Sequence, residues 1–159
     1  LLSQSGAAHF IVLERLQDPG NLGTILRAGE AAGITGVIMD SQTADIYNPK
    51  VIRSTMGAVF RVPFVYVEDL KAALLQLKDH GVHLYAAHLK GQNSYDQEDY
   101  TESTGFLIGN EAQGLSDEIA SLADTYVKIP MAGSVESLNA AIASSVLMFE
   151  VARQRRNQK

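Results

Sequence analysis

The chain has 159 residues, of which 46% are hydrophobic and 19% are charged, and it contains no cysteine. This length predicts one domain with a sizeable core, and the apolar fraction excludes a disordered chain. The absence of cysteine excludes a disulfide scaffold, a zinc ribbon and a thiol nucleophile, and it agrees with a reducing compartment. No apolar run approaches the roughly 20 residues that cross a bilayer, and no basic segment precedes Arg15. We therefore expect a cytoplasmic protein without a membrane partner.

The formal net charge of −5 is unevenly distributed. Residues 153–159 hold four of the thirteen Lys and Arg and no acid, which leaves nine cations against 18 acids in residues 1–152. An acidic body argues against a nucleic-acid partner. Charge alone favours a solvated helix end as the explanation of the basic tail, because cations stabilise the C-terminal end of a helix dipole.

The first part of the chain predicts a strand, a turn and a helix in succession. Residues 10–13 are a short apolar run typical of a buried strand, and residues 17–20 carry turn residues. Asn21 is the expected N-cap of a helix that runs to about Ala32, with Gly33 as its C-terminal stop. The apolar face of this helix consists of Leu22, Ile25, Leu26 and Gly29.

The middle of the chain continues the alternation. A strand at residues 36–39 is followed by a helix with Pro49 at its first position. The strand expected at 61–67 contains a proline, which favours a place at the edge of a sheet. A helix at 68–80 and a strand at 82–87 come next. The polar stretch from Lys90 to Thr104 is the best candidate for a mobile surface loop.

The last part of the chain repeats the same order. We expect a strand at 105–109, a short helix capped by Ser116, and a strand at 126–129. The final helix is expected to begin at Ser137, with an apolar stripe of Leu138, Ile142, Ser145 and Phe149. Strands that alternate with helices predict an α/β fold with a mainly parallel sheet and helices on both faces.

Several familiar sites are excluded. The sequence lacks the glycine fingerprint of dinucleotide-binding domains, the P-loop and the nucleophile elbow of hydrolases. His80 and His83 are expected at a helix end and in a strand, with no carboxylate motif beside them, so we predict no metal site.

Three loops at the carboxyl ends of strands carry polar residues, and this edge is where parallel sheets bind ligands. In residues 18–29, Arg27 points away from the apolar face, and an ion pair with Glu30 is the simpler explanation for it. In residues 105–115, Gly109 would let backbone approach a flat ligand, or the segment is a tight turn in which Glu111 accepts hydrogen bonds from loop amides. The residues alone leave both possibilities open. In residues 127–139 a strand end, a bend and a helix N-terminus converge.

Together the three loops resemble the motifs of the SpoU (TrmH-type) family of RNA ribose 2′-O-methyltransferases, within the SPOUT superfamily. The matching segments read PGNLGTILRAG at 19–29, GNEAQGL at 109–115 and IPMAGSVESLNAA at 129–141. The segment NPKVIRSTMG at 48–57 is similar to the ribosomal-RNA-directed branch of the family. The resemblance extends in order over residues 10–156.

This resemblance implies an α/β knot, in which the C-terminal segment forms a deep trefoil knot. Chains almost never thread loops, so the knot is expected from the resemblance alone. The knot would shape a pocket for S-adenosyl-L-methionine. The implied cofactor contacts are Gly109, Ile129 and Leu138, with Leu107, Met131 and Ser137 nearby.

The resemblance also implies the reaction, in which a ribose 2′-hydroxyl attacks the methyl carbon of the cofactor. The implied active-site residues are Arg27, Asn21, Glu111, Ser137 and Asn139. Because an arginine with a pKa above ~12 is a poor base, we expect Arg27 to act as a cation that stabilises the emerging alkoxide. Asn21 and Asn139 would orient Arg27 and the ribose, and Glu111 would fix this network.

Family members are homodimers, so we expect a homodimer whose active site is completed across the interface. The small residues Ala140, Ala141, Ala143, Ser144 and Ser145 would allow close helix contact, between subunits or within one. Residues 1–9 resemble the end of a linker to a removed N-terminal RNA-recognition domain, and residues 10–159 the catalytic domain. The expected substrate is ribosomal RNA. The alternatives are a one-domain transfer-RNA 2′-O-methyltransferase, a non-catalytic RNA-binding module and, more distantly, an oxidoreductase.

Overall fold

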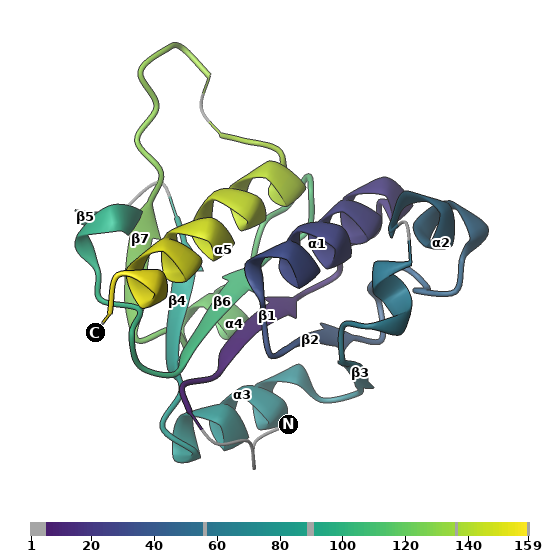
Figure 1. The fold of residues 1–159 in the computed structure, drawn as a ribbon, viewed down its shortest axis with the longest axis horizontal. Helices are drawn as coiled ribbons and strands as arrows, with labels where there is room; N and C mark the ends of the chain where they lie inside the picture. Colours follow the sequence, from purple (N-terminus) through teal and green to yellow (C-terminus); the bar gives the residue numbers. More distant parts are fainter. Residues whose placement is uncertain (1–5, 56, 89–90, 136, 159) are drawn as a thin grey trace.

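The computed structural model describes residues 6–55, 57–88, 91–135 and 137–158. At its centre lies a seven-stranded sheet in which every strand pair is parallel, in the order β3-β2-β1-β6-β4-β7-β5 (Figure 1). The strands are β1 (His9–Leu13), β2 (Gly36–Asp40), β3 (Phe64–Val67), β4 (His83–Ala87), β5 (Asn93–Ser94), β6 (Thr104–Ile108) and β7 (Thr125–Lys128). The helices are α1 (Pro19–Ala32), α2 (Pro49–Thr55), α3 (Leu70–Asp79), α4 (Asp117–Ala120) and α5 (Ala140–Arg156), with short 3-10 turns at Ala58–Phe60 and Tyr95–Gln97. The predicted α/β fold is confirmed.

Two apolar layers hold the helices against opposite faces of the sheet. Side chains of α1, α2 and α5 pack on one face, together with strand residues such as Ile11 and Phe106. Side chains of α3 and α4 pack on the other face, with strand residues such as Phe10 and Leu107. Successive residues of a strand point to opposite faces, so β1 and β6 contribute to both layers. None of the helices in the described ranges is long and apolar enough to cross a membrane.

Helix α1 starts three residues earlier than predicted. Its N-cap is Asp18, whose carboxylate accepts hydrogen bonds from the amides of Gly20 (2.7 Å) and Asn21 (3.1 Å). The prediction of Asn21 as the cap is therefore wrong. The C-terminal stop is confirmed, because Gly33 adopts a left-handed conformation with φ of 76°. With Asp18 as the cap, the side chain of Asn21 is free to take part in the site.

Helix α5 begins at Ala140, with Asn139 as the N-cap, and not at Ser137. The predicted apolar stripe is not its buried face, since Ile142 and Phe149 are 52% and 44% exposed. The buried residues are Ala141, Ser144, Leu147, Met148, Glu150 and Val151. Helix α5 carries apolar residues on more than one side, so periodicity could not select the buried one. Ala141 and Ser144 serve close packing within the chain.

Two further expectations need correction. The polar stretch from Lys90 to Thr104 is not simply a surface loop, because it contains β5 and a 3-10 turn, and its Tyr100 is fully buried. Lys90 itself lies outside the described residues. Strand β3 lies at an end of the sheet, as its proline predicted, but it begins only at Phe64. The amides of Arg61 and Val62 donate to the carbonyl of Ala58 and so close the preceding 3-10 turn instead of extending the strand.

Candidate active site

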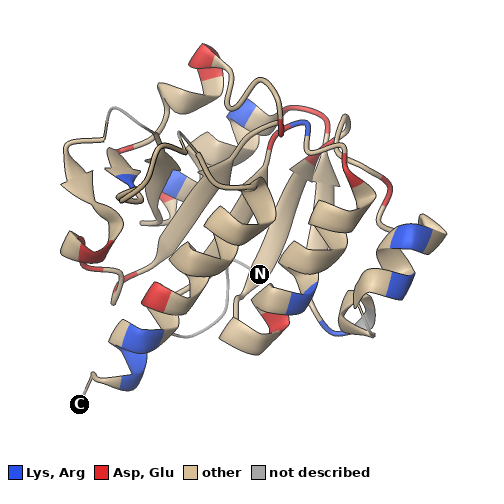
Figure 2. Ribbon diagram, turned by 90° about the horizontal axis from the view of Figure 1, so that it is seen from above, with Lys and Arg blue, Asp and Glu red and all other residues tan. Residues whose placement is uncertain are grey.

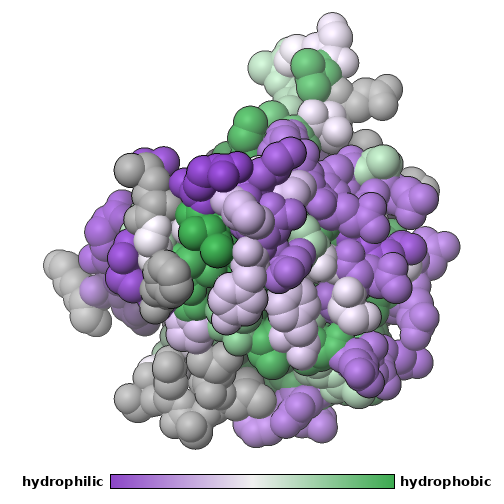
Figure 3. Space-filling model, turned by 90° about the vertical axis from the view of Figure 1, so that its right-hand side faces the viewer, coloured by the Kyte–Doolittle hydropathy of each residue, from purple (hydrophilic) through white to green (hydrophobic). Residues whose placement is uncertain are grey.

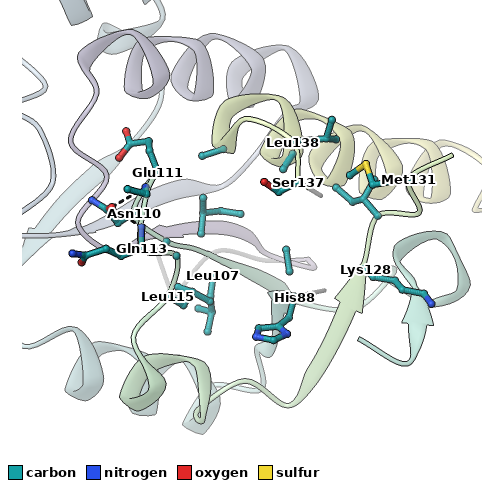
Figure 4. Close-up of a pocket in the computed structure, with 18 residues that line it drawn as sticks. His88, Leu107, Asn110, Glu111, Gln113, Leu115, Lys128, Met131, Ser137 and Leu138 are labelled. Carbon is teal, nitrogen blue, oxygen red and sulfur yellow. Dashed lines mark hydrogen bonds between the residues drawn. The ribbon is translucent and has the colours of Figure 1, made fainter. Parts of the chain in front are cut away.

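A pocket of about 380 Å³ lies at the carboxyl edge of the sheet, between the segments that follow β4, β6 and β7 and the start of α5 (Figure 4). All six residues predicted to contact a cofactor line it, namely Leu107, Gly109, Ile129, Met131, Ser137 and Leu138. Of the predicted catalytic residues, Glu111 and Ser137 line it. Asn21, Arg27 and Asn139 are not among the lining residues. The volume lies in the range of about 300–1,000 Å³ that is usual for small-ligand sites.

The walls of the pocket are largely apolar. Figure 4 shows Ser137, Leu138 and Met131 across the pocket from Leu107 and Leu115. Apolar side chains on two sides suit a flat ring, while the backbone of the loops offers donors and acceptors for its edge. Within the described residues, no group of three or more His, Asp or Glu could hold a metal ion.

The loop after β6 folds back tightly on itself. A Cβ atom on Gly109 would lie 2.2 Å from the carbonyl carbon of Gly114 and from the amide nitrogen of Leu115. The amide of Gly114 donates to the carbonyl of Asn110 (2.8 Å), and the amide of Asn110 donates to the carbonyl of Gly114 (3.1 Å). Gly109 thus accommodates the backbone of its own loop, as the tight-turn interpretation predicted.

Asn110 holds this loop together and was missed by the sequence analysis. Its side-chain oxygen accepts hydrogen bonds from the amides of Ala112 (2.9 Å) and Gln113 (3.0 Å). Its side-chain nitrogen donates to the carbonyl of Arg15 at 2.8 Å. An asparagine directly after a strand-ending glycine is a typical turn signal that could have identified it. The loop is therefore fixed both internally and to the segment after β1.

Three of the predicted site residues form one hydrogen-bonded chain. The side chain of Asn139 donates to Asn21 at 3.1 Å, and Asn21 donates to the carboxylate of Glu111 at 3.3 Å. Glu111 also accepts hydrogen bonds from the amides of Gln17 (3.1 Å) and Asp18 (2.7 Å). The structure thus brings together residues from the loops after β1 and β6 and the start of α5.

The hydrogen bonds of Glu111 decide its charge state. Partial burial raises the pKa of its carboxyl group, but the hydrogen bonds from Gln17, Asp18 and Asn21 outweigh burial and leave the pKa below its ordinary value. Glu111 therefore stays ionised at neutral pH. A carboxylate that stays ionised is suited to orienting neighbouring hydrogen-bond donors, and it is poorly suited to accepting or donating a proton.

A second carboxylate, that of Glu14, also links the segment after β1 to the segment after β6. Glu14, the residue directly after β1, is 7% exposed and accepts hydrogen bonds from the amide (2.8 Å) and the hydroxyl (2.7 Å) of Ser116. Ser116 also caps α4 through the amide of Ile119, as predicted. Glu14 was not singled out from the sequence, since a lone acid after a strand has no distinguishing pattern.

Arg27 lies outside this network. It is exposed on α1, and it makes no hydrogen bond or ion pair with the part of the chain that the structure describes. The simpler explanation, an ion pair with Glu30, is wrong, because Glu30 instead pairs with Arg61. The hydrogen bond from Arg61 lowers the pKa of Glu30. Arg27 is therefore available to a ligand or to another subunit.

Residues 8–149 match the SpoU rRNA Methylase family, and the chain belongs to this family. A TrmH family tRNA/rRNA methyltransferase of Staphylococcus aureus is 36% identical over 96% of this chain and 61% of its own length. The SpoU methyltransferase AviRb of Streptomyces viridochromogenes, solved with its cofactor AdoMet, superposes with a TM-score of 0.91. It is 34% identical, over 99% of this chain and 62% of its own. A structure of an RNA 2′-O ribose methyltransferase superposes with a TM-score of 0.86. It is 32% identical, and the match covers 96% of this chain and 58% of that chain.

The chain spans about three fifths of the length of the curated relatives that it matches. The superpositions confirm the architecture of the sheet and its helices. The trefoil knot stays a prediction from the family resemblance.

Proposed function

We propose that the protein transfers a methyl group from S-adenosyl-L-methionine to a ribose 2′-hydroxyl in RNA. The observation that carries this proposal is the pocket of about 380 Å³ lined by all six expected cofactor residues. Family membership and the AdoMet-bound relative support the cofactor, and the relative described as a 2′-O ribose methyltransferase supports the ribose as acceptor. We expect the protein to act in the cytoplasm.

The residues of the pocket fit this cofactor. Leu138 and Ile129 supply apolar surface for an adenine ring, and the folded loop 109–115 presents backbone groups to its polar edge. When bound, S-adenosyl-L-methionine supplies an electrophilic methyl group on a positively charged sulfur. The residues of the protein then have to bring the hydroxyl into line and exclude water.

The reaction forms a bond between the ribose oxygen and the methyl carbon, breaks the carbon–sulfur bond and releases the hydroxyl proton. Arg27 would pair with a phosphate of the RNA and stabilise the negative charge that develops on the oxygen. Water or a phosphate oxygen would accept the proton, since the guanidinium cannot. Asn21 and Asn139 would orient the ribose, held in place by Glu111.

We further propose a homodimer in which one subunit supplies Arg27 to the pocket of the other. Two observations support this arrangement. Arg27 is exposed and does not line the pocket of its own chain. Ile142 and Phe149 leave apolar surface exposed on α5, which packs beside α1 (Figure 1).

Ribosomal RNA is the proposed substrate, because the matched family is described by it and the segment 48–57 resembles that branch. A transfer RNA remains the alternative, since the Staphylococcus relative is described for both RNAs. Mapping ribose methylation in RNA from cells with and without the gene decides between them. Loss of a methyl group from transfer RNA only would refute the ribosomal assignment.

The mechanism is tested by Arg27→Ala in the full-length protein. We expect the affinity for S-adenosyl-L-methionine, measured by calorimetry, to stay unchanged while turnover on RNA falls about 10²–10³-fold. Arg27→Lys keeps the charge but loses the planar fork, so rescue by lysine would indicate charge stabilisation alone. Lys71→Ala, an exposed cation on α3, is the control. Wild-type turnover by Arg27→Ala would remove the central residue of the mechanism, and a non-catalytic module would show no turnover in any form.

A further inference from the structure

The turn between β2 and α2 presents an aromatic side chain to solvent. Tyr47 is 62% exposed, although its neighbour Ile46 is fully buried. Its ring contacts the ring of Phe64 edge-on, with centroids 6.2 Å apart and planes at 71°. A single exposed aromatic residue is common at a protein surface, so exposure alone indicates nothing. The hydrogen bonds that fix the backbone of this turn distinguish Tyr47 from an ordinary exposed aromatic residue.

The turn that carries Tyr47 is rigid. The hydroxyl of Tyr66 accepts a hydrogen bond from the amide of Ile46 (2.9 Å) and donates to the carbonyl of Ala44. The amide of Tyr47 donates to the side chain of Asp45 at 2.9 Å. A ring held by backbone fixed in this way loses little conformational entropy when a partner stacks on it.

Two cations lie on the helix that follows. Lys50 and Arg53 are exposed and stand three residues apart on α2, so they share one side of the helix, while Val51 and Thr55 are buried. Neither forms an ion pair with a carboxylate in the described residues. Figure 2 shows both cations on α2 with no acidic residue on that helix. Asp45 in the preceding turn is the one acid beside them in the described part of the chain, so the two cations leave a local basic surface on a chain whose body is acidic.

This basic surface adjoins the catalytic side of α1. A Cβ on Gly23 would lie 1.6 Å from the side-chain oxygen of Ser54, so α1 and α2 touch with no space between them. Arg27 follows Gly23 by four residues and therefore lies on the side of α1 that faces α2. The turn with Tyr47 follows β2, so it also lies at the carboxyl edge of the sheet. Figure 3 views the molecule from the side on which α2 and β3 lie.

We propose that Tyr47, Lys50 and Arg53 form a surface for single-stranded RNA, on which a base stacks on the ring of Tyr47 and the two cations contact phosphates. Exposed aromatic rings beside cations are the usual means of holding unpaired nucleotides. The surface would guide the strand next to the acceptor nucleotide past α2 towards Arg27. This inference rests on the proposed function, because it assumes an RNA substrate.

The test measures the affinity of the full-length protein for a short, labelled, single-stranded oligoribonucleotide of mixed sequence. We expect Tyr47→Ala to weaken binding about 5- to 100-fold, and Tyr47→Phe to bind like the wild type, because phenylalanine keeps the stacking face. The double variant Lys50→Gln with Arg53→Gln should weaken binding and reduce the slope of log affinity against log salt by about 1.4, or about 0.7 for each phosphate contact. The affinity for S-adenosyl-L-methionine should not change in these variants.

Two control variants lie elsewhere on the surface. Lys71→Gln removes an exposed cation from α3 on the other face of the sheet, and Leu75→Ala trims an exposed apolar residue of the same helix. If Tyr47→Ala and the double variant bind RNA as these controls do, the inference is wrong. A change in oligomeric state by Tyr47→Ala with unchanged RNA affinity would also overturn it, in favour of a protein contact. A wild-type protein that neither binds nor methylates RNA would refute the proposed function and this inference together.

Discussion

Replacing Gly109 with alanine tests whether the pocket depends on the close backbone contact in the loop after β6. The added Cβ would lie 2.2 Å from two backbone atoms, whereas carbon atoms in contact are about 3.5–4.0 Å apart. Backbone cannot rotate away as a side chain can, so the loop has to move by roughly 1 Å or more. Overpacking of this kind costs about 1–3 kcal/mol. Loss of the two hydrogen bonds between Asn110 and Gly114 adds about 0.5–1.5 kcal/mol each.

We therefore expect Gly109→Ala to lower the free energy of unfolding by about 2–6 kcal/mol, measured by urea denaturation. Calorimetry should also show weaker binding of S-adenosyl-L-methionine, because the displaced loop lines the pocket. Gly133→Ala is the matched control, since a Cβ on Gly133 meets nothing within 4 Å. Its stability should stay within about 0.5 kcal/mol of the wild type. Equal stability and affinity in the two variants would refute the argument from close contact.

Three further predictions concern other parts of the molecule. Glu14→Ala should lower the free energy of unfolding, measured by thermal denaturation, by about 1–3 kcal/mol, because it leaves Ser116 without its acceptor. Glu14→Gln should lower it less, and equal decreases in the two variants would contradict this reasoning. Burial, with a smaller contribution from Arg155, lowers the pKa of His9 from 6.5 to about 3, so the unfolded chain binds an extra proton and stability falls as the pH drops through this window. Between pH 7 and pH 5, His9 should therefore lower the unfolding free energy of the wild type by about 2 kcal/mol, and His9→Leu should lack this decrease. The same pH profile in both proteins would argue against a neutral buried His9. Phe149→Glu should convert the proposed dimer to a monomer in light scattering, whereas the same change at exposed Leu75 on α3 should not.

The sequence predicted the order of the main strands and helices because these elements follow local patterns. Apolar runs identified the central strands, and Gly33 and Ser116 marked helix ends through chemistry that acts within a few residues. The order of the strands in the sheet could not be predicted in this way, because it depends on contacts between segments that are distant in the sequence. β5, of two residues, has no signal of its own and exists only because it pairs with β7.

The errors near the site have a common physical cause. Asn21 and Asn139 are both good cap residues, but only Asn139 caps a helix, because the carboxylate of Asp18 is the cap of α1. Tyr100 was assigned to a mobile loop because the residues around it are polar. Its own burial depends on contacts with Tyr85 and Phe106, which lie on separate strands. Local patterns thus located the loops of the site, while tertiary contacts decided which residue caps each helix and which side chains are buried.

The interior position of β1 in the sheet has a consequence for how the chain folds. One edge of β1 pairs with β2, which is close in the sequence, with Phe10 opposite Gly36. The other edge pairs with β6, which is distant in the sequence, with His9 opposite Thr104. Such distant pairings are slow to form, since a long loop has to close before they gain any contact. A chain that emerges from the ribosome therefore exposes an apolar strand edge until residues 104–108 are made. That exposed edge is the point at which a chaperone would protect the nascent protein, or at which it would aggregate. The pocket, whose lining begins at Ala87, can form only after that stage.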